Sequence, residues 1–227
     1  MNYIDIIVFN LQICTLNTME EINQRITLEV CDDALDRLTD ENLLEEYKHC
    51  NSVKKRITKL SCLLEKYGID GVIKNKIIEE YTIDLVPPGT KGVIRGNKFN
   101  NIVKEYIENL SLNSEVYEVC FETNHPTHTT SEIPDWYILH KETNKILIGM
   151  NQLDLWGGGH QTNRGSKYLL NNTMNSENCR ILCVVCNQIQ FKGKNNKTYK
   201  LFEVGFENNT LCYLKNLQNI IYLYFQM

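Results

Sequence analysis

The chain has 227 residues, 42% of them hydrophobic and 23% charged, and its formal net charge is −4. This length and composition can bury the core of one ordinary domain with a helical extension, which excludes an intrinsically disordered protein. The net charge excludes a protein that binds nucleic acid through overall basicity. Acidic residues crowd the chain up to about residue 50, whereas many lysines and arginines follow later. We therefore expect either a locally basic face or scattered, solvated lysines.

The cysteines and the first residues bear on where the protein works. The chain contains nine cysteines, and its first segment carries Asp5 and no basic run of the kind that opens a signal peptide. That segment is also too short and too polar to cross a membrane. These features predict an intracellular, cytoplasmic protein in a reducing compartment, without a membrane partner. Cys183 and Cys186 are expected to face opposite ways on a buried strand, which argues against structural zinc.

Residues 1–86 are predicted to form a mainly helical region. Helices are expected over 18–38, over 40–64 with a cap at Asp40 and an end at Gly68, and over 72–81. Such a region provides packing, dimerisation or a clamp on DNA, and the sequence leaves these three roles open.

Residues 87–227 are predicted to form an α/β core after a break at Pro87, Pro88 and Gly89. The expected elements are a helix over 97–110, strands over 116–121, 136–139, 146–150 and 181–185, a helix over 160–171, a hairpin with strands over 188–191 and 199–204, and a helix or strand over 211–225. This order predicts a mixed central sheet flanked by helices.

The stretch from Glu132 to Leu170 is where we expect the chemistry. Asp135 opens one strand, and the next strand ends in the polar residues Asn151, Gln152 and Asp154. Hydrolysis of a phosphodiester requires a positioned water and stabilisation of charge, both of which Mg²⁺ supplies. Because Mg²⁺ takes oxygen ligands, usually from one or two carboxylates, Asp135 is the best single candidate for a metal ligand.

The pair Pro134-Asp135, a spacer of about fifteen residues and an apolar strand that ends in polar groups resemble the PD-(D/E)XK nuclease superfamily. Within that superfamily the chain looks most like a type II restriction endonuclease. The segment GVIRGNKFNNIVKEYI resembles the helix before the core sheet, and the resemblance covers roughly residues 90–205. It implies a restriction-endonuclease-like fold and Mg²⁺-dependent cleavage of double-stranded DNA by a homodimer. We expect no organic cofactor.

The second strand departs from the superfamily pattern of an acidic residue, one intervening residue and a lysine. Residues 149–154 read Gly-Met-Asn-Gln-Leu-Asp, without lysine or glutamate. Alternation places Gln152 and Asp154 on one face and Asn151 on the other, and the pattern leaves open which of them acts. The expected catalytic residues are Asp135, Asn151, Gln152, Asp154 and Lys167, with Asp135, Asp154 and Gln152 as metal ligands, Arg164 as an alternative cation, and Glu132 and Glu118 as further acidic candidates.

The segment that follows this strand is predicted to contact DNA. Its three glycines allow close approach of the backbone to a phosphate, and its amide and basic side chains are those that read base edges. The expected DNA-binding residues are Trp156, Gly158, His160, Gln161, Asn163, Arg164 and Lys167. In the alternative reading the glycines form a flexible connection and the amides satisfy backbone groups.

These features predict a type II restriction endonuclease that cuts at a short specific sequence. One alternative is a catalytically inactive DNA-binding module on the same fold, in which the missing glutamate and lysine reflect lost chemistry. Another is an interaction protein whose amide cluster is structural. The last reading requires no salt-dependent affinity for DNA, whereas both DNA readings do.

Overall fold

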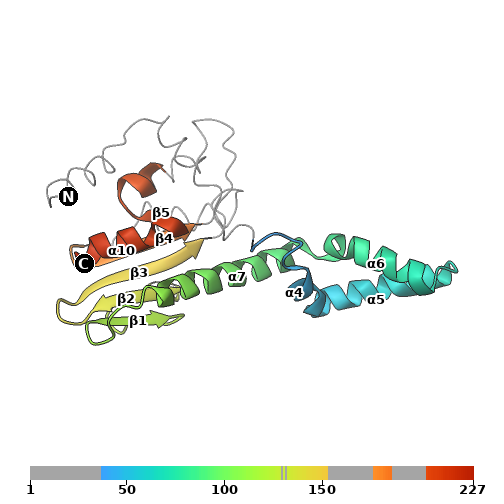
Figure 1. Cartoon of the computed structure of the whole chain (residues 1–227), viewed down its shortest axis with the longest axis horizontal. Coiled ribbons are helices and arrows are strands. Elements are labelled where there is room, and N and C mark those ends of the chain that lie inside the picture. Colours follow the sequence, from blue (N-terminus) through green and yellow to red (C-terminus); the bar gives the residue numbers. More distant parts are fainter. Residues whose placement is uncertain (1–36, 129, 131, 153–175, 186–202) are drawn as a thin grey trace. The chain divides into compact units, whose positions relative to one another are not determined.

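A computed structural model of the chain describes residues 37–128, 130, 132–152, 176–185 and 203–227. The described residues combine helices with a mixed sheet, so the predicted α/β class is confirmed (Figure 1). The described residues divide into two compact units, a helical unit that ends at residue 102 and a sheet unit within 103–227. The helix expected over 18–38 lies outside the described residues except at 37 and 38, which form a turn.

The helical unit contains α4 (Leu44–His49), α5 (Asn51–Lys66), α6 (Gly71–Leu85) and the first part of α7 (Pro88–Asn109). The expected single helix over 40–64 is wrong, because the backbone at Cys50 is extended, with φ −72° and ψ 133°, and separates α4 from α5. Asp40 does not cap this helix. Its carboxylate instead accepts hydrogen bonds from the Tyr47 hydroxyl at 2.8 Å and the Lys91 ammonium at 2.5 Å.

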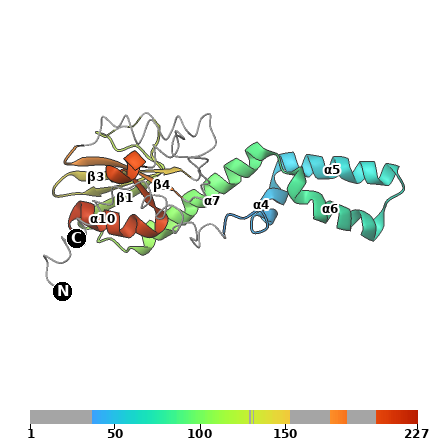
Figure 2. The same ribbon diagram turned by 90° about the horizontal axis from the view of Figure 1, so that it is seen from above.

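The helices α5 and α6 run side by side, joined by a turn in which Gly68 takes a φ of +76° (Figures 1 and 2). This left-handed backbone is a common way to end a helix and suits glycine. The expected end of the helix at Gly68 is therefore confirmed, and α6 extends the helix expected over 72–81. The break expected at Pro87 and Pro88 marks the start of α7, since proline fits the first position of a helix.

The sheet unit contains β1 (Tyr117–Phe121), β2 (Trp136–His140), β3 (Lys145–Gln152), β4 (Cys179–Val185) and β5 (Leu211–Tyr213), in that spatial order. The first three strands are antiparallel, and β3, β4 and β5 are parallel. Four expected strands are thus confirmed, and no end differs from its expected position by more than two residues. The polar turn between β2 and β3 places Asn144 at a φ of +55°, a conformation that asparagine tolerates.

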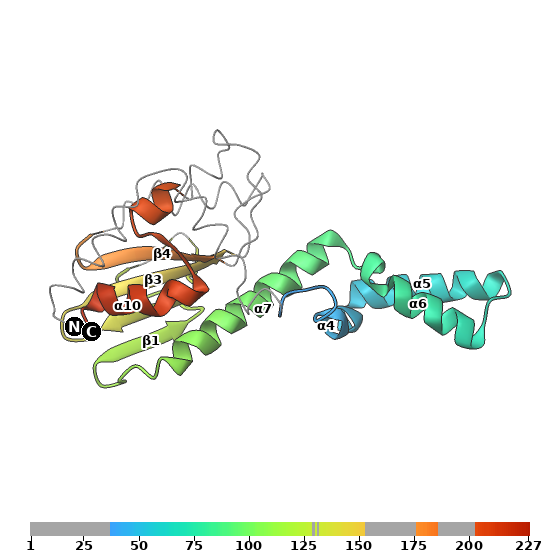
Figure 3. The same ribbon diagram turned by 45° about the horizontal axis from the view of Figure 1, so that its top comes forward.

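One face of the sheet is covered by α10 (Leu217–Phe225) and by the last turns of α7 (Figures 2 and 3). The Lys104 ammonium lies 5.1 Å from the centre of the Phe121 ring, and Phe225 packs edge-on against Tyr117. Phe121 and Tyr117 share a strand face, because they are separated by an even number of residues. The opposite face carries the buried cluster Tyr137, Leu139, Ile146, Ile148, Met150, Cys179, Ile181, Cys183, Val185, Leu211 and Tyr213.

Residues 211–225, which the sequence left as a helix or a strand, form both in succession, with a short 3-10 turn (Leu214–Asn216) between β5 and α10. The strand expected over 199–204 is wrong at its end, because Glu203 and Val204 lie in a helical segment over 203–207. The helix expected over 160–171 and the strand over 188–191 lie outside the described residues. Among the helices of the described part, none combines the length and apolar character needed to cross a membrane.

Candidate functional site at one end of the sheet

Asp135 is the residue immediately before β2, and its backbone is bonded on both sides. Its N–H donates to the carbonyl of Gly149 in β3 at 3.1 Å, and its carbonyl accepts from the N–H of Glu122, next to β1, at 3.0 Å. The carboxylate is held as well, because its Oδ2 accepts the backbone N–H of Asn151 at 2.6 Å. The side chain that the sequence singled out is therefore fixed at the point where β2 begins and β3 ends.

A second hydrogen bond, on the other face of the sheet, holds the same point, which we call the Trp136 corner and which consists of Asp135, Trp136, Gly149 and Asn151. The indole N–H of Trp136 donates to the side-chain oxygen of Asn151 at 3.1 Å, and Trp136 is only 1% exposed. Gly149 makes room for this ring, because a Cβ on that residue would lie 1.8 Å from Cε2 of Trp136. Asn151 therefore contacts Asp135 through its backbone and Trp136 through its side chain.

Gln152 and Asn151 lie on opposite faces of β3, as alternation requires. Asn151 is on the Trp136 face, whereas Gln152, 8% exposed, is on the face of Met150 and Cys183. Asp135 precedes Trp136 and so shares the face of Gln152. Burial raises the pKa of the Cys183 thiol, and the nearby carboxylate of Asp135 raises it further, which agrees with this placement.

The parallel pairing of β3 with β4 brings Gln152 beside Val185, so both strands end at the same edge. Asp135 opens the antiparallel neighbour β2 at that edge. Ligands of open α/β sheets bind outside the carboxyl ends of the strands. The sequence prediction that Asp135 and the end of the second strand come together is thus realised for Asp135, Asn151 and Gln152.

A second polar cluster lies on the same face as Asp135 and Gln152. The Tyr137 hydroxyl donates to Glu118 Oε1 at 2.7 Å, and this bond is the main cause that lowers the pKa of Glu118. The His125 ring lies edge-on to Tyr137, 5.3 Å between ring centres. Burial and the neighbouring His128 lower the pKa of His125, and Glu118 partly opposes them.

From the sequence, Glu118 is predicted only as a further acidic candidate, and its contact with Tyr137 is not predicted. Tyr137 and Glu118 are 19 residues apart, and their contact depends on the register of β1 against β2, in which Glu118 pairs with Leu139. The signal available beforehand was the alternation of both strands, which puts the two residues on one face once they are paired. For Glu132, the backbone carbonyl accepts a hydrogen bond from the Thr130 hydroxyl.

The remaining predicted site residues fall in 153–175 and so lie outside the described residues. They are Asp154, Trp156, Gly158, His160, Gln161, Asn163, Arg164 and Lys167. Their expected roles stay predictions.

The donors at this sheet end fit a hard cation. Mg²⁺ is held in proteins by one or two carboxylates, with waters and substrate phosphates completing its shell. Asp135 offers one carboxylate and Gln152 one amide oxygen from the same face. Within the described ranges, no set of three or more histidine, cysteine, aspartate or glutamate residues is arranged to hold a metal ion, and the second expected carboxylate, Asp154, falls beyond them.

Comparison of the chain with protein-family models, with characterised proteins and with solved structures finds no significant match.

Proposed function

We propose that the protein is a Mg²⁺-dependent endonuclease that hydrolyses phosphodiester bonds of double-stranded DNA at a short specific sequence. The observation that carries the proposal is the fixed carboxylate of Asp135, bonded to the Asn151 N–H and sharing a sheet face with Gln152. A carboxylate in a set position at the carboxyl end of parallel strands is suited to bind a cation next to a bound phosphate.

In this proposal each side chain at the sheet end has a separate task. Asp135 would supply the negative charge that holds the metal, and the Asn151 N–H keeps one of its oxygens oriented. Gln152 would supply a neutral oxygen on the same face, and the expected second carboxylate and cation are Asp154 and Lys167, which follow in the sequence. The bound Mg²⁺ would stabilise charge on the phosphoryl oxygens and activate a water.

Trp136 and Asn151 act as positioning residues. They maintain the corner in which Asp135 sits, because the indole bond fixes the Asn151 side chain while the Asn151 N–H binds the carboxylate. A shift of about 1 Å in a catalytic group can cost two orders of magnitude in rate, so such anchoring has a direct value for catalysis. We also propose a homodimer, which would bring two sites to the two strands of a symmetric DNA site.

The test compares two substitutions of Asp135 on long, unmethylated duplex DNA, with Mg²⁺ or with EDTA. Asp135→Asn removes the charge but keeps an oxygen that can accept the Asn151 N–H, so folding should survive. Wild type should give discrete bands in Mg²⁺ alone, and Asp135→Asn should lose at least about 100-fold in cleavage rate, the scale of removing one charge-stabilising group. Asp135→Ala should lose cleavage and also some stability.

Two results would contradict the proposal. Cleavage that persists in Asp135→Asn would remove Asp135 from the chemistry. Intact DNA in Mg²⁺ together with a salt-dependent mobility shift would favour the inactive DNA-binding module. The observation in favour of that alternative is that residues 149–154 contain neither the lysine nor the glutamate that the superfamily pattern leads one to expect there.

A further inference from the structure

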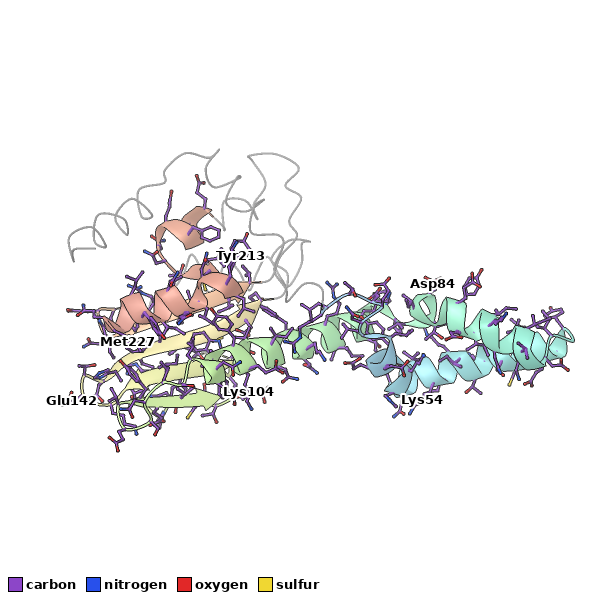
Figure 4. The ribbon with its side chains drawn as sticks, in the orientation of Figure 1. Lys54, Asp84, Lys104, Glu142, Tyr213 and Met227 are labelled. Carbon is purple, nitrogen blue, oxygen red and sulfur yellow. The ribbon has the colours of Figure 1, made fainter. Side chains whose placement is uncertain are left out.

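The outer face of α5 carries a row of lysines. Lys55, Lys59 and Lys66 are all exposed, and with a period of 3.6 residues they fall within a narrow stripe of the helix together with Cys62. The opposite face holds the apolar residues of the helix, of which Val53 is fully buried. We call Lys55, Lys59, Cys62 and Lys66 the lysine stripe. Lys54, drawn on α5 in Figure 4, adds a further positive charge beside it.

Within the described residues these lysines have no carboxylate partner, unlike four of the five other lysines of the helical unit; the fifth, Lys76 of α6, makes no ion pair either. In the rest of the helical unit, Lys48 pairs with Glu45, Lys74 with Glu65, Lys91 with Asp40 and Lys98 with Glu46, at N–O distances between 2.5 and 3.2 Å. No ion pair within the described part of the chain involves Lys54 or any lysine of the stripe. The one acidic residue of α5, Glu65, is taken by Lys74 of α6.

This arrangement works against the stability of the helix. Lys55 and Lys59 are four residues apart, a spacing at which like charges destabilise a helix by about 0.2–0.5 kcal/mol. Five basic residues and a single acidic one make α5 strongly positive within a chain of net charge −4. A uniform sign along one face, without the compensating acids found on α4 and α7, is what a polyanion partner requires.

We propose that the lysine stripe of α5 binds the phosphate backbone of double-stranded DNA. The inference rests on the proposed function, since that function makes duplex DNA the polyanion present. Lys55 and Lys66 are separated by about 16 Å along the helix, from a rise of about 1.5 Å per residue. This span exceeds the width of the major groove, about 12 Å, so the row can reach phosphates on both sides of it.

The surroundings of the stripe favour DNA over a membrane surface. A helix that lies in a membrane presents a large apolar face to the lipid, flanked by its lysines. In the first half of α5 the residues of that face, Val53 and Ile57, pack in the core of the helical unit with Tyr47 and Val86, and the exposed apolar side chains lie only near the turn to α6. The stripe itself contains Cys62 and no large apolar side chain.

The first experiment measures how the dissociation constant of the full-length protein for duplex DNA depends on salt, in Ca²⁺ to prevent cleavage. Each phosphate contact contributes about 0.9 to the slope of log K against log salt. The double substitution Lys55→Gln and Lys59→Gln should lower this slope by about 2. The matched control, Lys141→Gln with Lys215→Gln, removes two exposed lysines of the sheet unit and should leave the slope unchanged.

The second experiment uses the natural thiol of Cys62, which is free and exposed. Alkylation of Cys62, followed by mass spectrometry of its peptide, should slow at least several-fold when saturating DNA is added. An unchanged rate of Cys62 alkylation, or an unchanged salt slope in Lys55→Gln/Lys59→Gln, would overturn the inference.

The outcomes separate this inference from the proposed function. If wild type cleaves DNA and the α5 variant keeps its slope, the inference fails and the nuclease stands. If wild type shows no salt-dependent affinity for DNA, both fail. Binding to vesicles with anionic lipid that is lost in the α5 variant, with DNA affinity unchanged, would assign the stripe to a membrane surface instead.

Discussion

The sheet unit and the helical unit hold their polar groups in different ways. In the sheet unit, Asp135 and Asn151 are fixed by hydrogen bonds between strands whose side chains are almost all buried. In the helical unit, ion pairs such as Lys74–Glu65 and Lys98–Glu46 and the unpaired lysine stripe lie at the surface. The hydrogen bonds of the sheet unit fix the positions of single atoms. The charges of the helical unit determine the net charge of a surface.

The two units also differ in how completely they bury their apolar side chains. The strands of the sheet bury Ile138, Ile146 and Leu147 completely. Near the turn between α5 and α6, by contrast, Leu63, Tyr67, Val72 and Ile73 are at least half exposed. The helical unit has a compact core around Leu43, Tyr47, Val53 and Val86, which does not extend to this turn. A change of the same size should therefore have very different effects in the two units.

The largest difference is expected for the substitution of isoleucine by alanine. Ile148 is 1% exposed, so Ile148→Ala should lower the free energy of unfolding by about 2–5 kcal/mol, because the lost side chain leaves a cavity in a packed sheet. Ile73, 66% exposed, should change it by less than about 0.5 kcal/mol. Urea denaturation followed by circular dichroism measures both. Equal losses would mean that the turn of the helical unit is covered in solution.

The two units also differ in how much of them the sequence could predict. The strands around Trp136, Ile146 and Ile181 were found because each is a short apolar run between polar turns, a pattern that a sheet imposes directly. The break at Cys50 was missed, because apolar residues continue at helical spacing on both sides of it. A change of direction that leaves the periodicity intact has no local signal.

The candidate site was predictable in part for a related reason. Asp135 and the end of β3 were placed together correctly, since a hairpin with a short turn fixes its own register. The bond between Trp136 and Asn151 and the need for Gly149 depend on packing across that register, which side-chain identity alone does not supply. Alternation along the strand predicts that Asn151 and Gln152 lie on opposite faces. Which of the two shares a face with Asp135 follows only from the pairing of β2 with β3.

The next prediction concerns glycine to alanine in the two units. Gly149→Ala places a methyl group inside the Trp136 ring, and such overpacking should cost about 1–3 kcal/mol of unfolding free energy. Gly92→Ala, in an exposed position of α7 with no atom within 4 Å of the added carbon, should stabilise by about 0.5–1 kcal/mol. Thermal unfolding of both variants tests the opposite signs.

Cleavage should separate these two glycine variants further. A displaced indole can no longer hold the Asn151 side chain, so Gly149→Ala should also lower the rate of DNA cleavage at temperatures where it is folded. Gly92→Ala should cleave like wild type. A folded Gly149→Ala protein with full activity would show that the Trp136 corner is structural only.

The last prediction concerns Tyr47, where the helical unit, like the sheet unit, buries a side chain that makes a hydrogen bond. The buried Tyr47 donates its hydroxyl proton to Asp40, so Tyr47→Phe should cost about 1 kcal/mol of unfolding free energy at pH 7. Burial opposes ionisation of Asp40, but the hydrogen bonds from Lys91 and Tyr47 outweigh it and lower the pKa of this carboxyl.

A lowered pKa in the folded state means that Asp40 stabilises the protein above its unfolded pKa, which is about 3.9, and stops doing so as the pH falls through the folded value. The difference in stability between wild type and Tyr47→Phe should therefore be full at pH 7 and shrink below about pH 4. Chemical denaturation at pH 7, 5 and 3 measures it. A difference that stays constant with pH would assign the loss to packing of the ring. A difference that shrinks would assign the loss to the hydrogen bond between the Tyr47 hydroxyl and the ionised carboxylate of Asp40.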